Sequence, residues 1–227
     1  MITEAGGIAS AATLSTYALA RLAQHRFPSR WLAPVLVTPA VLGLGLWLIH
    51  VPALTFYQQT SWLLWFLGPA TVAFAVPIYQ QREWLRRYPL SIAAGVVTGV
   101  VLGVASSWLA GHLFHLSPAL AKSLLLRSIS TPFALAAAQT TGASPPLTAL
   151  VVMLTGFAGM VLGEVVLLWV RPQSPLAHGA LWGAASHAFG TARAYQLDSQ
   201  AGAIASLVMI LAGIVLILLA PWLGFLC

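Results

Sequence analysis

Residues 202–226 read GAIASLVMILAGIVLILLAPWLGFL, a run without a single charged side chain. A helix that crosses a membrane needs about 20 mostly apolar residues, so this run is long enough. The whole chain has the same character, because 59% of its 227 residues are hydrophobic, only 6% are charged and the mean hydropathy is +0.90. Soluble domains carry about 25% charged residues. The composition therefore predicts an all-α, polytopic transmembrane helical bundle rather than a soluble domain.

Outward from this run, three further stretches lack charge: between Arg30 and Arg82, between Arg87 and Lys122, and between Arg127 and Glu164. Together they predict seven or eight apolar segments in one transmembrane domain over residues 1–227. The expected ranges are 5–23, 31–50, 61–80, 90–113, 120–139, 147–170, 176–197 and 202–226. Residues 51–60 are expected to form an interfacial loop. Segment 176–197 either spans the membrane or re-enters it, and the side of the C-terminus depends on which.

The net charge of +6 is gathered in short basic clusters between apolar runs. These clusters are Arg21, Arg26 and Arg30, then Arg82, Arg86 and Arg87. Such clusters mark cytoplasmic loops facing anionic lipid headgroups, so no nucleic-acid partner is expected and the N-terminus is placed outside. The single cysteine, Cys227, excludes a disulfide within the chain and a cysteine-based metal site. We expect no metal and no cofactor.

A weak internal repeat is visible at an offset of 57 residues. Pro89-Leu90-Ser91 aligns with Pro146-Leu147-Thr148, and Thr98-Gly99 aligns with Thr155-Gly156. A proline-interrupted segment precedes each copy, at Gly68-Pro69 and at Ser130-Thr131-Pro132. Paired interrupted segments point to the binding site of a transporter. Chance agreement among small and apolar residues is the alternative.

The two breaks, Pro69 and Pro132, are the first candidate site elements. Proline opens backbone groups that an intact helix would satisfy, and in hydrocarbon those groups must find partners or line a cavity. The N-terminus of a half-helix then suits a carboxylate. Hydroxyl groups of Thr71, Ser130 and Thr131 lie beside the breaks as further donors. A simple kinked helix is the alternative at each proline.

Arg127 lies inside the fifth apolar segment, deeper than Lys122. Cations within a membrane are rare and mark functional sites, and a guanidinium can hold a carboxylate through two hydrogen bonds. Arg127 is therefore a candidate substrate ligand. The alternative for Arg127 and Lys122 is that each side chain extends so that its charged end reaches the membrane surface.

The segment Ser186-His-Ala-Phe-Gly-Thr-Ala-Arg193 is a polar island in an apolar chain. Ser186, His187, Thr191 and Arg193 are candidate substrate ligands, and the imidazole of His187 can also pass a proton near neutral pH. The alternative is a histidine satisfied by neighbouring hydroxyls. A serine hydrolase is not expected, because Ser186 lacks the surrounding glycine pattern and no acid is placed to orient His187.

Glu164 is the acid that lies well inside an apolar run, seven residues before Arg171. Burial would favour its protonated form, which makes it a second candidate for proton coupling. The alternative is a position near the membrane surface. The glycine runs Gly95-x-x-x-Gly99-x-x-x-Gly103 and Gly156-x-x-Gly159-x-x-x-Gly163 are interpreted as helix-packing faces.

Taken together, these segments resemble the LrgB/CidB family of bacterial membrane proteins. The residues that carry the resemblance are Leu67-Gly-Pro-Ala-Thr-Val-Ala73, Arg127-Ser-Ile-Ser-Thr-Pro132, Leu154-Thr-Gly156 and Gly183-Ala-Ala-Ser-His-Ala-Phe-Gly-Thr-Ala192. The resemblance is clearest over residues 61–227, and the Ser-His-x-x-Gly-Thr-Ala block is its most specific part. One departure is Arg127, where family members typically carry lysine.

The resemblance implies a multi-pass protein of the bacterial inner membrane that works with a smaller LrgA/CidA-like partner. It also extends to the C-terminal part of the plastid glycolate/glycerate translocator. We therefore expect a non-enzymatic carrier of small monocarboxylates such as glycolate, glycerate, lactate or pyruvate. A homodimer and coupling to protons through His187 or Glu164 are further expectations. The alternative function, also implied by the family, is an antiholin-like regulator of murein hydrolase export and autolysis.

Overall fold

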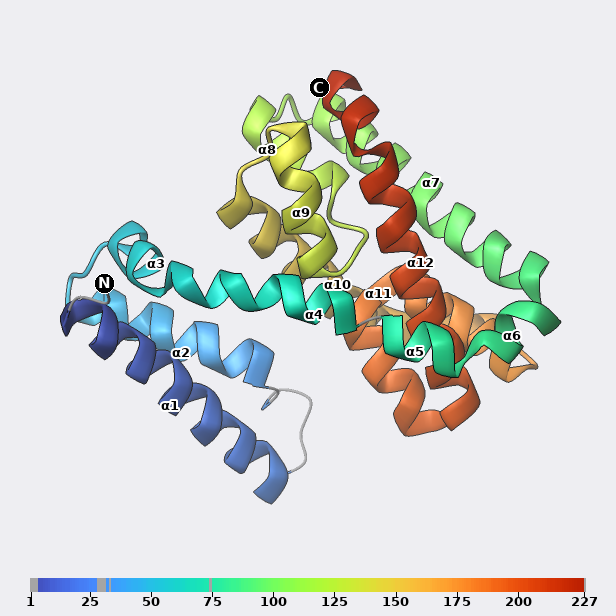
Figure 1. Ribbon diagram of the computed structural model, residues 1–227, viewed down its shortest axis with the longest axis horizontal. Coiled ribbons are helices and arrows are strands. Elements are labelled where there is room, and N and C mark those ends of the chain that lie inside the picture. Colours follow the sequence, from blue (N-terminus) through green and yellow to red (C-terminus); the bar gives the residue numbers. More distant parts are fainter. Residues whose placement is uncertain (1–3, 28–31, 33, 74, 227) are drawn as a thin grey trace. The chain divides into compact units, whose positions relative to one another are not determined.

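The computed structural model describes residues 4–27, 32, 34–73 and 75–226, and all the secondary structure in this part of the chain is helical (Figure 1). This confirms the all-α fold class. The chain divides into two compact units, Met1–Gly68 and Pro69–Cys227, and each is described by itself.

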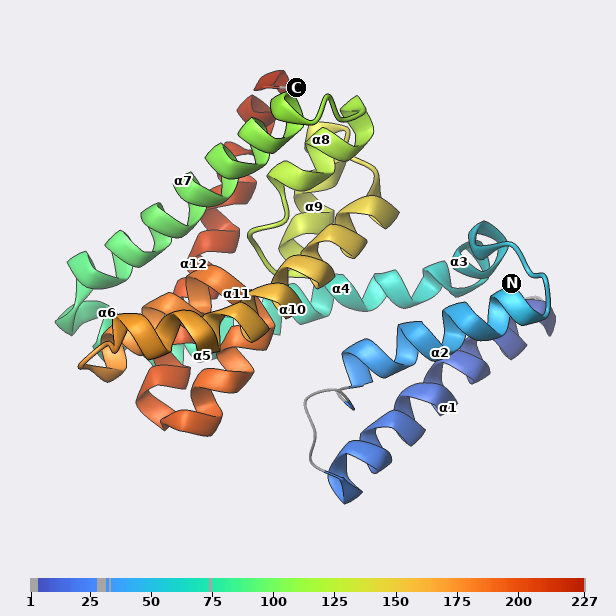
Figure 2. The same cartoon turned by 180° about the vertical axis from the view of Figure 1, so that it is seen from behind.

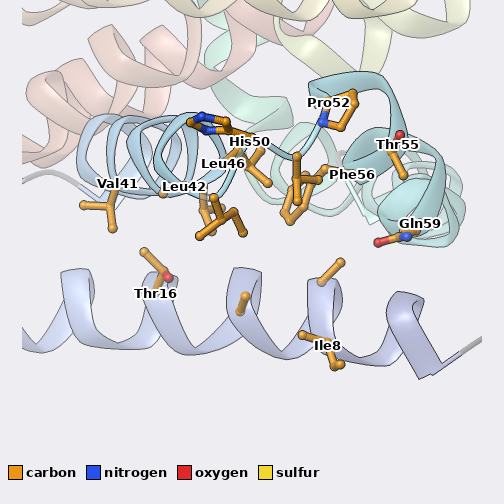
Figure 3. Close-up of a pocket in the computed structure, with 15 residues that line it drawn as sticks. Ile8, Thr16, Val41, Leu42, Leu46, His50, Pro52, Thr55, Phe56 and Gln59 are labelled. Carbon is orange, nitrogen blue, oxygen red and sulfur yellow. The ribbon is translucent and has the colours of Figure 1, made fainter.

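The first unit is built on two antiparallel helices, of which the second is strongly apolar, and a short third one (Figures 1 and 2). It contains α1 (Glu4–Arg26), α2 (Pro34–Leu48), α3 (Ala53–Thr60) and the 3-10 helix η2 (Ser61–Phe66). Trp62 Nε1 donates a 2.8 Å hydrogen bond to Ser10 Oγ and so ties η2 to α1. An apolar groove of about 590 Å³ lies between α1, α2 and α3 (Figure 3). Residues 53–60 are helical, so the expected loop at 51–60 is wrong, because Pro52 starts a helix there.

The second unit contains the helices that are long and apolar enough to cross a membrane. Among the described residues there are three, α7 (Pro89–Leu113), α10 (Pro145–Val170) and α12 (Ser199–Leu223), the last continued by η3 (Gly224–Leu226). Three short helices precede α7: α4 (Leu67–Ala73), which contains the boundary between the units, α5 (Ala75–Gln80) and α6 (Arg82–Arg87). The C-terminal ends of α7 and α12 lie close together, near the C-terminus of the chain, in both views (Figures 1 and 2).

Between α7 and α10 the chain forms a re-entrant hairpin, here called the first hairpin (residues 118–141). Its arms are α8 (Pro118–Leu125) and α9 (Thr131–Thr141), and residues 126–130 form its tip. Ser123 Oγ of α8 donates to the carbonyl of Ala119 at 2.7 Å and lies 3.4 Å from the carbonyl oxygen of Ser144, so α8 packs close to the start of α10. Phe133 packs on Gly213 and Thr141 packs near Gly224, so α9 runs parallel to α12 toward the C-terminus.

The expected break at Ser130-Thr131-Pro132 is confirmed, since α8 ends at Leu125 and α9 starts at Thr131, but the two parts of segment 120–139 form a hairpin. Ser117 and Gly142 flank the first hairpin on the same side, and α8 and α9 are too short to span a membrane singly, since 8 and 11 residues rise only about 12 and 17 Å. The hydrophobic pattern alone cannot distinguish a kinked span from a hairpin, because both bury the same apolar residues.

The second hairpin is α11 (Pro175–Leu197), which is interrupted at His187 (φ 44°, ψ −122°). Gly190 lies against the carbonyl of Trp182, whereas residues eight apart in a straight helix are separated by about 12 Å. The helix therefore folds back on itself, with residues 175–186 as its first arm and 188–197 as its second. Segment 176–197 is therefore a hairpin and not one straight helix.

Contacts with α12 fix the directions of the two arms of the second hairpin. Gly179 packs on Ala201 and Gly183 on Ala205, so the first arm runs parallel to α12. Tyr195 then packs back on Gly202, so the second arm returns. Leu197 consequently ends near the start of α12, and the hairpin enters from the opposite end of the unit to the first hairpin.

The two hairpins start 57 residues apart, which is the offset of the internal sequence repeat. Ser117-Pro118 starts the first hairpin and Ser174-Pro175 starts the second, each after one long helix, and Ser130 at one tip corresponds to His187 at the other. The repeats have inverted orientation, as in many transporter folds. The break that pairs with residues 126–130 is thus His187, whereas α4 continues as a helix through Gly68-Pro69.

Glycines allow the hairpins to pack closely against the long helices, in agreement with the interpretation of the glycine runs as packing faces. A Cβ at Gly99 would lie 2.9 Å from Ala184 Cβ, and one at Gly159 would lie 2.7 Å from the carbonyl oxygen of Ala185. A Cβ at Gly183 would lie 2.9 Å from Ala205 Cα. Since backbone atoms cannot rotate away, these positions allow close approach only while no side chain is present.

Gly183→Ala is expected to lower the thermal stability of the purified protein in detergent. The added methyl group meets the backbone of α12, and overpacking of this kind costs about 1–3 kcal/mol. Gly45→Ala is the matched control, because a Cβ there has nothing within 4 Å. Equal melting temperatures for the two variants would contradict the seating of the second hairpin on α12.

Candidate functional site

The tips of the two hairpins meet inside the second unit. The imidazole of His187 interacts with the backbone of Ser128, and Arg127 is close enough for its charge to act on His187. Gly103 of α7 lies against Ser128, and Gly156 of α10 lies against His187 and Phe189. Gly103 and Gly156 both lie near the middle of helices long enough to span a membrane. The meeting point therefore lies near the middle of the bilayer that these helices would cross.

Three buried polar atoms at the tips have no hydrogen-bond partner among the described residues. They are Ser130 Oγ, Ser186 Oγ and His187 Nε2, in residues that are 4%, 0% and 2% exposed. Other such atoms, for example on Thr148 and Trp182, are scattered along single helices. An unsatisfied buried polar group costs about 1–3 kcal/mol. Ser186 Oγ faces Gly159 of α10, and all three atoms belong to residues at the ends of the hairpin arms, so each has an unused capacity for a hydrogen bond to a ligand.

Helix ends add partial positive charge at the same place. Ser130 is the N-cap of α9, but its side chain makes no capping bond, and Pro132 lies in the first turn. The second arm of the second hairpin starts immediately after His187. The first N–H groups of a helix have no partner within it and attract anions. Two such N-termini lie at the tips, and both favour an anion such as a carboxylate.

Arg127 brings a full positive charge to the first tip. Its Nε donates to Ser107 Oγ and its Nη2 donates to Ser106 Oγ, both at 2.9 Å. These bonds fix the guanidinium between the tip and α7. Among the described residues, no carboxylate forms an ion pair with Arg127. The charge of Arg127 acts on His187, and its binding of a substrate stays a prediction.

The backbone of His187 is held in a region that favours glycine. Its φ of 44° is unusual for a residue with a side chain, and such conformations cost about 1–3 kcal/mol and occur preferentially at functional sites. A glycine would fit the turn better but would remove the imidazole. Histidine therefore stands at a position whose backbone conformation favours glycine.

Arg193 and Glu164 form an ion pair away from the tips. Arg193 Nε lies 2.6 Å from Glu164 Oε1, and Arg193 Nη1 also donates to Gln196 Oε1 at 3.2 Å. The pair joins the second arm of the second hairpin to α10. Substrate binding by Arg193 and proton coupling by Glu164 stay predictions, and each would require this pair to open.

The remaining candidates lie around or outside the tips. Thr191 is buried and donates to Met209 Sδ at 3.8 Å, and Thr131 is the half-buried first residue of α9. Pro69 is exposed in α4, and a Cβ on Gly68 would meet nothing within 4 Å among the described residues. The side chain of Thr71 lies outside the described part of the chain. The contacts that the structure describes therefore place Arg127, Ser130, Ser186 and His187 at the tips, and they do not place Pro69 there.

Two functional residues were missed by the sequence reasoning. Ser106 and Ser107 accept hydrogen bonds from Arg127, whereas the sequence predicts only an apolar segment at residues 90–113 that contains them. Adjacent hydroxyls in the second half of an apolar helix were the available signal, because such a pair needs a partner in a membrane. The pairing of Ser130 with His187 was also available from the 57-residue offset.

Comparisons with known proteins find relatives that align with nearly the whole chain. The uncharacterized protein YwbG of Bacillus subtilis (strain 168) is 37% identical over 93% of this chain and 94% of its own length. The holin-like protein CidB of Staphylococcus aureus (strain N315) is 31% identical over 92% of this chain and 91% of its own. No solved structure matches.

The profile of the LrgB-like family matches residues 13–225, which include both hairpins and all three long apolar helices of the second unit. This match, together with relatives that cover nearly the full length, confirms the resemblance to the LrgB/CidB family. The chain is a membrane protein that belongs to the LrgB-like family.

Proposed function

We propose that the protein carries small monocarboxylates across the bacterial inner membrane, with glycolate, glycerate, lactate and pyruvate as the substrate class. The observation that carries this proposal is the group of three unpartnered polar atoms on Ser130, Ser186 and His187 at the two facing tips. Arg127 and two half-helix N-termini supply positive charge beside them. A compact anion with one further oxygen fits this set of groups.

Each group has a distinct part in recognition. The guanidinium of Arg127 and the N–H groups at the start of α9 hold the carboxylate. Ser130 Oγ and Ser186 Oγ bind the hydroxyl or oxo group, and His187 Nε2 donates to the substrate or accepts from it. The site provides binding groups without the nucleophile and base of a hydrolase, so no chemical conversion is proposed. Proton coupling through His187 remains part of the proposal.

The inverted hairpins offer a route from each side of the membrane to the tips. The first hairpin enters from the end of the unit near Leu113, and the second enters from the end near Val170. Displacement of one hairpin at a time would expose the tips to one side at a time. An LrgA/CidA-like partner and a homodimer belong to the same proposal.

A second function is favoured by the names of the relatives. CidB of Staphylococcus aureus is described as holin-like, which suits a regulator of lysis without a transport cycle. In that case the tips would serve only to hold two half-helices together. The two functions differ in whether substitutions at the tips change the movement of a small anion or only the stability of the fold.

Arg127→Gln is expected to reduce uptake of labelled glycolate into membrane vesicles. Loss of hydrogen bonds to a charged group costs about 1.5–3 kcal/mol, which raises the apparent KM roughly tenfold or more. Arg26→Gln, which alters an exposed arginine of α1, is the control and should leave uptake unchanged. If Arg127→Gln takes up glycolate like the wild type, the assigned anion role is wrong.

Ser186→Ala separates a ligand-binding hydroxyl from a structural one. Removal of a buried hydroxyl without a partner should leave the melting temperature unchanged or raise it, whereas substrate affinity should fall. Ser123→Ala is the control, because Ser123 Oγ is bonded to the carbonyl of Ala119 and its loss should affect stability rather than affinity. A lower melting temperature for Ser186→Ala with unchanged uptake would support the purely structural role.

The holin-like alternative is tested by lysis assays in cells that lack the chromosomal copy. If the carrier function underlies the phenotype, His187→Ala and Arg127→Gln should abolish complementation while the protein remains in the membrane. Full complementation by both variants, with no uptake by the wild type of glycolate, lactate or pyruvate, would favour the regulator and contradict the carrier.

A further inference from the structure

We propose that residues 75–88 form a headgroup site for an anionic phospholipid, and that the bound lipid restrains the second hairpin. The segment comprises α5, α6 and Tyr88, and it leads directly into α7 at Pro89. It carries a dense set of arginines and aromatic rings on a chain with few charges. The site is separate from the hairpin tips and does not involve the transported substrate.

Two of the three arginines of this segment lie against aromatic rings rather than carboxylates in the contacts that the structure describes. The Arg82 guanidinium lies 4.5 Å from the centre of the Tyr79 ring, and that of Arg87 lies 5.4 Å from the Tyr88 ring. Both arginines are exposed. Arg82 Nη1 also donates to the carbonyl of Tyr79 at 3.0 Å, which leaves its other N–H groups for an anion. A guanidinium oriented by a ring can give bidentate hydrogen bonds to a phosphate.

The segment is also anchored at the right depth for a headgroup. Trp84 and Leu85 pack against the main core cluster, while Arg86 and Arg87 remain exposed. Trp84 stacks on Tyr88 with ring centres 5.6 Å apart. Tryptophan and tyrosine concentrate at membrane interfaces, and arginines just beyond the end of a span attract anionic lipids. A soluble anion would gain nothing from the apolar side of this arrangement.

The charge of the surrounding surface favours an anion. The end of the second unit where α7 starts also receives the ends of α10 and of the second hairpin, so it carries Arg171 in addition to the three arginines of α6. Glu83 and Asp198 are the acids in these connecting segments. Four arginines against two acids leave a net positive surface around the segment.

A hydrogen-bond chain connects the segment to the second hairpin. Gln81 Nε2 donates to Tyr195 Oη at 3.2 Å, and Tyr195 Oη lies 3.3 Å from Ser206 Oγ of α12. Tyr195 belongs to the arm that returns from His187. A lipid that fixes residues 75–88 therefore also fixes the returning arm, because both share this hydrogen bond.

The binding test measures the melting temperature of the full-length protein in detergent with added POPG or POPC. We expect POPG to raise it more than POPC, and Arg82→Gln/Arg87→Gln to lose most of this difference. The control is Arg21→Gln/Arg26→Gln, which removes equal charge from exposed positions of α1 and should keep it. Equal losses in both variants, or no loss in the first, would overturn the proposed site.

Inorganic phosphate at the same concentration separates a lipid site from a phosphate site. We expect it to give no stabilisation, since it lacks the acyl chains that hold a headgroup at the interface. Stabilisation by phosphate as large as that by POPG would overturn the assignment to a lipid.

The link to the hairpin is tested by hydrogen–deuterium exchange. POPG should slow exchange of residues 188–197 in the wild type. Tyr195→Phe should keep the POPG effect on the melting temperature but lose the slowing, because the ring remains packed on Gly202 while its hydroxyl is gone. Unchanged exchange in the wild type, or slowing that persists in Tyr195→Phe, would overturn the link.

Discussion

The structure depends on a constraint that hydrocarbon imposes on broken helices. Backbone N–H and carbonyl groups that a helix leaves open must find partners, because a lipid chain offers none. Here two hairpins interrupt their helices at residues 126–130 and at His187, and each tip is buried against the other. The glycines of α7, α10 and α12 follow from this constraint, since only bare helix faces let the hairpins reach the middle of the unit.

The same constraint explains why the tips are suited to a ligand. A protein that needed only to close two hairpins would satisfy every polar group at their meeting point. Instead, Ser130, Ser186 and His187 keep unpartnered polar atoms, and Arg127 is held by the hydroxyls of Ser106 and Ser107. The Glu164–Arg193 pair lies away from the tips and fastens one arm to α10. Charges that hold the fold are thus separated from charges that face the site.

Much of this arrangement could be predicted from the sequence, because it follows from hydrophobicity and repeat spacing. The long apolar helices, the glycine faces and the 57-residue offset were visible in the residues themselves. The fold-back of the second hairpin was left open, since a spanning helix and a hairpin have the same apolar pattern. The pairing of Gly68-Pro69 with Pro132 failed because proline is compatible with a continuing helix in its first turn, as at α4. His187, which breaks its helix without proline or glycine, gave no such local signal.

The central claim is that both hairpin tips meet at one place, and disulfide cross-linking in native membranes tests it most directly. The measurement uses Ser128→Cys/His187→Cys in a Cys227→Ser background, with a protease site inserted in the exposed loop at residues 171–174. After oxidation and cleavage, the account predicts that the two fragments stay joined until reduced. It also predicts that they separate in Ser128→Cys/Asp198→Cys, where the second cysteine lies at the base of its hairpin. Separation of the fragments in the first pair would contradict the account.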